Sequence, residues 1–231
     1  MRRLFLATAM LGLVYGSYSR ADIQAYSTSN SMGNQDWGGN LGLDFNVNSA
    51  ITVTQLGAFD SGQDGFVGAI TVGLFERLPG TADPSSDHTG TLLASVAISG
   101  SEGTLSGNYR FLPLLSPLTL APGFYDITAV GFSGSDPNLN ENAGSVLINT
   151  NTGGGLISFV GSGRYDKNGT LDYPSETTDQ QGYNTSSHVF GGGSFLFVAV
   201  PEPSSLAIAG LSGAILLVCF FFWSHRRRAV A

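Results

Sequence analysis

The stretch FDSGQDGF carries the sharpest chemical signal in the body of the chain. Asp60 and Asp64 flank Gly62, so a tight turn can bring two carboxylates together. Calcium loops use oxygen ligands at alternate positions and a glycine at the sixth, which is Gly65 here. The third position is a glycine, however, and the twelfth is Thr71, where such a loop needs a bidentate glutamate. The sequence therefore favours a hairpin turn with solvated aspartates and keeps a calcium site as the alternative.

Four aromatic residues lie in polar, loop-like segments: Trp37, Tyr165, Tyr173 and Tyr183. Exposed aromatic rings among Asn, Asp and Gln are typical of sugar-binding surfaces, because the rings stack and their polar ends form hydrogen bonds. The same rings can instead anchor loops over the body of the protein. The pattern favours anchoring, and a ligand-binding surface is the alternative.

The sequence lacks the usual signatures of catalysis. The only cysteine, Cys219, lies in the apolar C-terminal stretch, so the body has no thiol chemistry and no cysteine ligands for zinc. His88 lies in a loop-like segment and His188 begins an expected strand. No Gly-x-Ser-x-Gly elbow, phosphate loop or dinucleotide fingerprint is present. We therefore expect no enzymatic activity and no cofactor.

The elements that must position these residues are β-strands. Short apolar or alternating segments, bounded by Gly, Pro, Asn, Asp or Ser, recur through the body. This pattern predicts an all-β fold, an antiparallel β-sandwich or jelly roll, over residues 22–198. Besides the strand that begins at His188, the expected strands are residues 41–47, 51–59, 69–76, 91–98, 109–114, 123–132, 145–150, 155–161 and 194–200.

The net charge of the body limits the classes of partner that it can bind. Residues 22–200 hold sixteen acidic and four basic residues, a net charge of about −12. Such a surface repels the phosphates of nucleic acids and anionic lipid headgroups. We therefore expect no DNA or RNA partner, and divalent cations suit the body better.

The N-terminus reads as a secretory signal peptide over residues 1–21. Arg2 and Arg3 precede an apolar stretch that begins at Leu4, and small residues at Ser19 and Ala21 fit a cleavage site after Ala21. The apolar stretch is too short for a permanent membrane span. The mature chain is therefore expected to begin near Asp22 and to lie outside the cytoplasm.

The C-terminal part predicts a membrane span. Residues 206–223 contain no charge, and as a helix they would extend for ~27 Å, about the thickness of the bilayer hydrocarbon. Arg226, Arg227 and Arg228 follow and would remain on the cytoplasmic side. We expect one transmembrane helix here.

A proline-bracketed glutamate precedes this span. Pro201 and Pro203 restrict their own φ angles and favour extended conformations at Val200 and Glu202, so a protease can grip the segment. The order of parts in residues 199–228 resembles the PEP-CTERM sorting signal of exported bacterial proteins, a tail also found under the label of an ice-binding-protein C-terminal domain. Ice binding itself is not expected, because Thr-x-Thr pairs such as Thr52/Thr54 and Thr150/Thr152 are too few for a flat ladder.

This resemblance implies a substrate of exosortase, a membrane protease that cuts near the motif, in biofilm-forming bacteria that produce exopolysaccharide. Residues 51–132 also resemble a β-sandwich module of exported proteins, the DUF4082-like group of unknown function. We therefore expect an exported, non-enzymatic protein of the cell surface or extracellular matrix. It would be held in the cell membrane by its tail until exosortase processes it. The alternative is a carbohydrate-binding module on the same fold.

Overall fold

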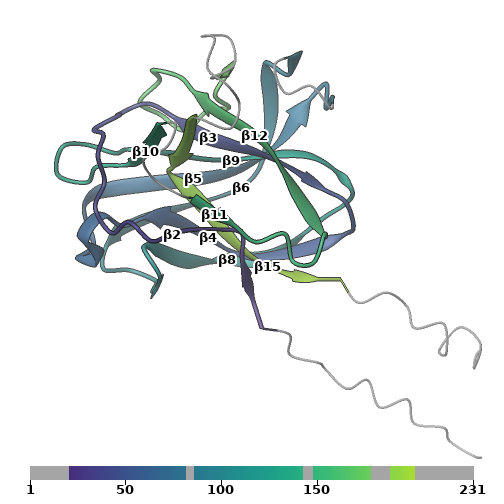
Figure 1. The fold of residues 1–231 in the computed structure, drawn as a ribbon, viewed down its shortest axis with the longest axis horizontal. Helices are drawn as coiled ribbons and strands as arrows, with labels where there is room; N and C mark the ends of the chain where they lie inside the picture. The colour runs from purple at the N-terminus through teal and green to yellow at the C-terminus, as the bar shows by residue number, and fades with distance from the viewer. Residues whose placement is uncertain (1–20, 82–85, 143–147, 178–187, 201–231) are drawn as a thin grey trace, which may run out of the picture.

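The computed structural model describes residues 21–81, 86–142, 148–177 and 188–200, and these form an all-β fold (Figure 1). Apart from one short 3-10 turn, η1 (Ser61–Gln63), the regular elements are strands. They are β1 (Ile23–Gln24), β2 (Tyr26–Thr28), β3 (Leu41–Val47), β4 (Ile51–Phe59), β5 (Phe66–Leu78), β6 (Thr89–Gly100), β7 (Thr104–Ser106), β8 (Tyr109–Leu120), β9 (Gly123–Val130), β10 (Leu139–Asn142), β11 (Ile148–Thr150), β12 (Ile157–Tyr165), β13 (Glu176–Thr177), β14 (His188–Gly191) and β15 (Gly193–Ala199).

Two antiparallel sheets make up the sandwich. The five-stranded sheet has the order β1-β15-β4-β8-β7, and the six-stranded sheet has the order β13-β12-β3-β9-β5-β6. Two small ribbons, β10-β14 and β11-β2, accompany them. The strand order mixes elements that are distant in sequence, so consecutive strands repeatedly change sheet (Figure 1).

The core lies between the two sheets and follows from alternation along the strands. In β3, Leu43 and Phe45 point inward, and across the core the ring of Phe45 lies 4.8 Å from that of Phe195 on β15. Both phenylalanines are fully buried, as a two-sheet core requires. The main core runs from Ala25 to Phe197, so residues 22–200 contain the whole of it among the described residues.

The predicted strand pattern is confirmed for most of the body. β3 and β4 have the expected bounds, whereas β5 and β8 extend further than expected. β8 continues through two prolines: Pro113 is the partner of Gln55 at the edge of a bulge, and Pro117 lies inside that bulge, where β8 leaves its neighbour β4 and a missing amide hydrogen costs little. The structure adds four short strands that the pattern missed at β1, β2, β7 and β13, together with β10.

The expectation of a hairpin at FDSGQDGF is wrong. β4 belongs to the five-stranded sheet and β5 to the six-stranded sheet, so this turn carries the chain from one sheet to the other. Alternation predicted both flanking strands correctly, but pairing between two strands is a tertiary property that alternation does not encode.

The predicted termini fall almost wholly outside the described residues. None of the described segments forms a helix long and apolar enough to cross a bilayer. The expected span over residues 206–223 lies outside them, as does the signal peptide up to residue 20.

Candidate functional site

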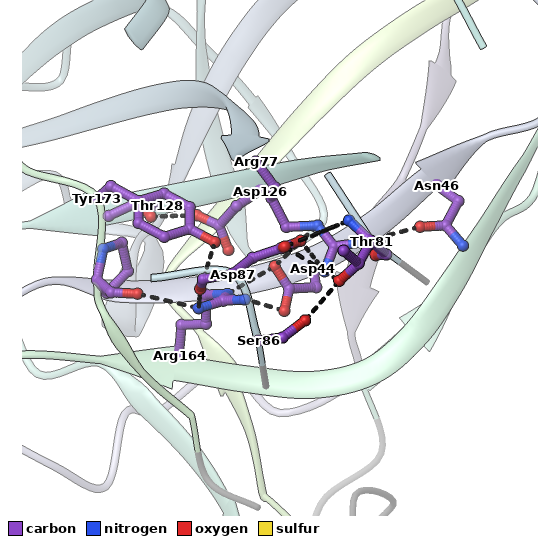
Figure 2. A network of polar contacts seen from close by, with 11 residues as sticks. Asp44, Asn46, Arg77, Thr81, Ser86, Asp87, Asp126, Thr128, Arg164 and Tyr173 are labelled. Atoms are coloured by element: carbon purple, nitrogen blue, oxygen red, sulfur yellow. Dashed lines mark hydrogen bonds and ion pairs between the residues drawn. The ribbon is translucent and has the colours of Figure 1, made fainter. Parts of the chain in front are cut away.

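The most concentrated group of charged side chains lies on the outer face of the six-stranded sheet (Figure 2). Asp44 on β3 is the register partner of Asp126 on the adjacent strand β9. Arg164 on β12 and Arg77 on β5 lie on the strands to either side. Because Leu43 and Phe45 point into the core, alternation turns Asp44 to the opposite face. The ordinary expectation for that face is solvent, yet these side chains are buried.

Arg164 and Asp44 form the strongest pair of this network. Nε of Arg164 lies 2.8 Å from both Oδ1 and Oδ2 of Asp44. Nη1 of Arg164 donates to the backbone carbonyls of Asp87 at 2.8 Å and Pro174 at 3.4 Å. Arg164 therefore connects its own sheet to two loops that cover it.

Arg77 makes longer contacts with the same group. Its Nε lies 3.6 Å from Oδ1 of Asp44, and its Nη1 lies 3.5 Å from Oδ2 of Asp87. Nη2 donates to Oδ1 of Asn46 at 3.2 Å, and the guanidinium lies 5.2 Å from the ring centre of Phe124. Both side chains of each ion pair are fully buried, so the guanidinium is held between two carboxylates.

Two loops close the network from outside. In the first, Thr81 donates to the carboxylate of Asp87 from its backbone nitrogen at 3.2 Å and from Oγ1 at 3.1 Å. In the second, the ring of Tyr173 lies 4.9 Å from the Arg164 guanidinium, and its hydroxyl donates to the carbonyl of Asp87 at 3.4 Å. Tyr173 is only 5% exposed, so it seals the network from solvent.

Burial raises the pKa of both sheet aspartates. Loss of hydration raises the pKa of Asp44 to about 7, reinforced by the neighbouring Asp126 and opposed by the two arginines. Burial likewise raises the pKa of Asp126 to about 6, while Arg164 and a hydrogen bond from Thr128 oppose the rise. Oδ2 of Asp126 accepts no hydrogen bond from the described residues, so nothing local compensates that oxygen.

The geometry of this arrangement suits a role in holding the loops on the sheet. Shifted carboxyls often mark catalytic sites, but here they face arginines beneath two loops and not an open cleft. In the described part of the chain, no three His, Cys, Asp or Glu side chains converge to hold a metal ion. The network can therefore clamp loops to the sheet, and the same ion pairs couple sheet and loops electrostatically.

The two aspartates of the FDSGQDGF turn differ from each other in burial. Asp60 is fully buried, and its Oδ2 accepts from Nε of Arg110 at 2.9 Å and from Nη2 at 2.8 Å. Its Oδ1 accepts from the backbone nitrogen of Gly65 at 3.1 Å. Only Asp64 is exposed, so the expectation of two solvated aspartates is wrong for Asp60. An arginine distant in sequence takes the place that water or calcium was expected to fill.

The predicted aromatic surface is divided by the fold. Tyr173 is buried over Arg164, so it anchors a loop and offers no exposed ring. Trp37 and Tyr165 are half-buried and lie together, with ring centres 6.0 Å apart in an edge arrangement. The indole nitrogen of Trp37 donates to the carbonyl of Asp166 at 2.9 Å. Tyr183 lies outside the described residues.

A second polar centre, which sequence reasoning missed, closes the loop 166–172. The amide nitrogen of Asn40 donates to Oδ1 of Asp166 at 2.9 Å and to the carbonyls of Asn168 at 3.0 Å and Thr170 at 2.9 Å. Its amide oxygen accepts from the backbone nitrogen of Asp172 at 3.1 Å. Asn40 is fully buried, so a single side chain provides hydrogen-bond partners for the backbone groups that face the inside of the loop.

One feature of the sequence marks all of the buried arginine–aspartate pairs. The body contains only three arginines, Arg77, Arg110 and Arg164, and each stands within a strand. A charge in a strand of a two-layer fold either faces solvent or needs a buried partner. All three arginines are buried against aspartates. Asp44 and Asp60, the partners of Arg164 and Arg110, lie 120 and 50 residues away in the sequence, which explains why local pattern alone missed these pairs.

The two ends of the body lie side by side. β1 pairs antiparallel with β15, with Ile23 opposite Phe197 and Gln24 opposite Leu196. Val200 donates from its backbone nitrogen to the carbonyl of Ala50 at 3.3 Å, directly after the last strand. The start of β1 and the end of β15 therefore leave the sandwich at the same end, visible at the lower edge of Figure 1.

Comparison with known proteins identifies the segment behind this end of the body. Residues 199–228 match the family model described as the PEP-CTERM protein-sorting motif. The chain carries a PEP-CTERM sorting motif. This match confirms the resemblance drawn from Pro201, Glu202, Pro203 and the arginines at residues 226–228, all of which lie within the matched range. No curated protein matches the chain.

The PEP-CTERM motif defines the route of the protein. Proteins with this motif are exported, and exosortase processes them at the membrane. The motif begins at Ala199, the last residue of β15, so the sorting signal joins the folded body without an intervening domain.

Proposed function

We propose that the chain is an exported, non-enzymatic β-sandwich protein that exosortase delivers to the cell surface or extracellular matrix. The observation that carries this proposal is the PEP-CTERM motif at residues 199–228, directly behind the last strand of the body. The predicted span at 206–223 would hold the body at the membrane until processing, and the predicted signal peptide would export it. The adjacent exits of β1 and β15 support this route, because both ends can face one membrane while the body projects outward.

A non-enzymatic role agrees with the placement of the charged residues. The two carboxyls with raised pKa values, Asp44 and Asp126, lie under Tyr173 and are matched by arginines. A substrate would have to displace the covering loops to reach them. His88 is exposed at the surface and contacts the carbonyl of Ser175 at 3.4 Å, away from a convergent set of groups.

Cell fractionation with intact-mass analysis in an exosortase-producing host tests this proposal. The wild-type chain is expected outside the cytoplasm, without residues 1–21 and with a shortened C-terminus. The triple substitution Pro201→Ala, Glu202→Ala, Pro203→Ala removes the motif and is expected to leave the chain uncut in the membrane fraction. Glu176→Ala, which changes an exposed glutamate of the body, serves as the matched control and should be processed normally. A soluble cytoplasmic chain that retains both termini would contradict the proposal.

Carbohydrate binding is the second candidate, and the pairing of Trp37 with Tyr165 favours it. Their half-buried rings lie at a loop surface with the exposed polar residues Asp36 and Asn168. The proposed ligand class is an exopolysaccharide, whose sugar faces stack on aromatic rings. A glycan array with residues 22–200 tests this, and Trp37→Ala should abolish a saturable signal. Met32→Ala, at an exposed apolar residue of the same segment, should leave that signal unchanged.

A further inference from the structure

Three strand connections lie at the end of the sandwich where β1 begins and β15 ends. β4 and β12 begin at this end, and β3 and β8 finish at it, because each of these strands pairs antiparallel with a neighbour. The three connections are residues 48–50 between β3 and β4, 121–122 between β8 and β9, and 151–156 between β11 and β12. We call these residues the exit face.

Backbone hydrogen bonds join the exit face into one surface. The nitrogens of Asn48 and Ser49 donate to the carbonyl of Leu156 at 2.8 Å and 3.2 Å. The connection 121–122 adjoins them from the other side, because β8 pairs with β4 up to its last residue and β9 pairs with β3 from its first. Since Val200 donates to the carbonyl of Ala50, the chain leaves the body directly beside this surface.

The exit face is uncharged, although the body is strongly acidic. Its three segments read NSA, AP and NTGGGL, whereas residues 22–200 have a net charge of about −12. Most of the residues of the exit face are exposed, so this neutral surface faces outward. Asp22 is exposed beside it, just before β1, and the predicted cleavage after Ala21 would add an α-ammonium group to that residue.

The charged groups of the body lie away from the exit face. At the same end of the sandwich, Glu76 and His88 are exposed near the connection from β5 to β6, of which residues 82–85 lie outside the described residues. β5 and β6 are the outer strands of the six-stranded sheet, so this corner is separated from β3 and β12 by β9. At the opposite end of the sandwich, the exposed acidic residues include Asp36, Asp64 and Glu102.

The length of the tail determines how far the body stands from the membrane. Residues 201–205 are the link between Val200 and the start of the predicted span at residue 206. Five fully extended residues reach at most ~18 Å. A sandwich held this close must turn one of its surfaces toward the lipid headgroups. Anionic headgroups repel an acidic surface, so the neutral exit face has the lowest electrostatic cost in that position.

We propose that the exit face rests on the bilayer surface while the chain is anchored, an inference that rests on the membrane anchor of the proposed function. Its amide and hydroxyl side chains, such as those of Asn48, Ser49 and Asn151, suit this partner because they donate hydrogen bonds to lipid phosphate and carbonyl oxygens. The same orientation directs Trp37 and Tyr165, which lie at the opposite end of β3 and β12, away from the membrane.

Quenching of a fluorescent label by nitroxide-bearing lipid headgroups tests this orientation. The full chain is purified from membranes of a host without exosortase and reconstituted into vesicles of phosphatidylcholine and phosphatidylglycerol. Cys219→Ser removes the native cysteine, and Ser49→Cys or Ser135→Cys then carries the label. Both positions are exposed, at opposite ends of the sandwich. The label at position 49 should be strongly quenched and that at position 135 should not, because the nine residues of β4 separate the two ends by ~30 Å.

An added charge provides the second arm of the experiment. Ala121→Glu places a carboxylate on the exit face and should reduce quenching at position 49 in the anionic vesicles, with recovery at high salt. It should have no effect in vesicles of phosphatidylcholine alone. Ser135→Glu adds the same charge at the opposite end and is the matched control, with quenching at position 49 unchanged. Since both positions are exposed, the melting temperatures of the two variants should match that of the parent chain.

The outcomes separate the orientation from the anchor. Equal quenching at positions 49 and 135 would overturn the orientation and leave the anchor in place. Quenching that Ala121→Glu does not change in anionic vesicles would do the same. A chain that fails to float with the vesicles would contradict the anchor itself, and the orientation with it.

Discussion

Asp44 shows how a single residue can depart from the pattern of its strand. Its neighbours Leu43 and Phe45 face the core, so Asp44 faces outward and would ordinarily be hydrated. It is instead 1% exposed and contacts two arginines. Removing charges from water costs several kcal/mol per ion, so the pairs form only where geometry and hydrogen bonds compensate that cost. The short contacts of Arg164 supply this compensation.

Asp44→Asn is expected to destabilise the body through a lost hydrogen-bond acceptor. The asparagine keeps the shape and the uncharged state of the side chain, but its amide nitrogen replaces one of the two oxygens that accept from Nε of Arg164. A loss of about 1–3 kcal/mol in the free energy of unfolding is expected, measured by urea denaturation. Asp64→Asn removes an exposed carboxylate of the same kind and should change the free energy by less than about 0.5 kcal/mol. Equal stabilities of the two variants would contradict a role for the network.

At the scale of elements, the covering loops decide the character of the outer sheet face. Two glycines make room for the second loop. A Cβ at Gly90 would lie 2.3 Å from Cδ2 of Tyr173, and one at Gly73 would lie 2.8 Å from Cδ2 of Leu171. Because Gly73 on β5 and Gly90 on β6 have no side chain, the loop can approach the sheet closely enough to bury the ion pairs.

Asn40 holds the start of the same loop, and its removal is expected to open it. Asn40→Ala deletes the hydrogen bonds that the amide nitrogen shares among three oxygens of loop 166–172 and the one bond that the amide oxygen accepts from that loop. Lys167 is exposed within this loop, so trypsin cleavage after Lys167 reports its opening. A local loss of about 1.4 kcal/mol would raise the cleavage rate about tenfold. Asn48→Ala, which removes the exposed side-chain hydrogen bonds to Gly155 and from Ser158, should cleave at the wild-type rate.

The elements themselves were largely predictable, whereas the loops were not. β3 and β4 follow from alternation within nine or fewer residues, which is a local property. The outward positions of Asp44 and Asp126 were equally readable from alternation. Their burial was not, because it depends on Tyr173 and Asp87, which reach the sheet from loops far along the chain.

At the scale of the whole molecule, the buried aspartates give stability a pH dependence. Their pKa values in the folded state, about 7 for Asp44 and about 6 for Asp126, exceed the ordinary value of 3.8. The folded state therefore binds more protons than the unfolded state between these values. The stabilising contribution of the two groups is fully present below about pH 4 and is lost as the pH rises through about 6 and 7.

Asp126→Asn tests this dependence directly. The variant removes one of the two raised carboxyls, so its free energy of unfolding should fall less steeply between pH 4 and pH 7 than that of the wild type. Urea denaturation across this pH range gives both slopes, and comparison of the slopes cancels the contribution of the exposed carboxylates. Parallel curves for wild type and variant would show that Asp126 does not titrate in this range.

The sequence by itself determined the sorting motif and the all-β fold class of this protein. The PEP-CTERM motif is contiguous, and strand alternation is a property of neighbouring residues, so both are legible without a structure. Only the tertiary structure decided which outward faces are buried, that Asp60 pairs with Arg110, and that the two ends of the body emerge together. Each of these depends on contacts between segments tens of residues apart, which the spacing of neighbouring residues does not encode.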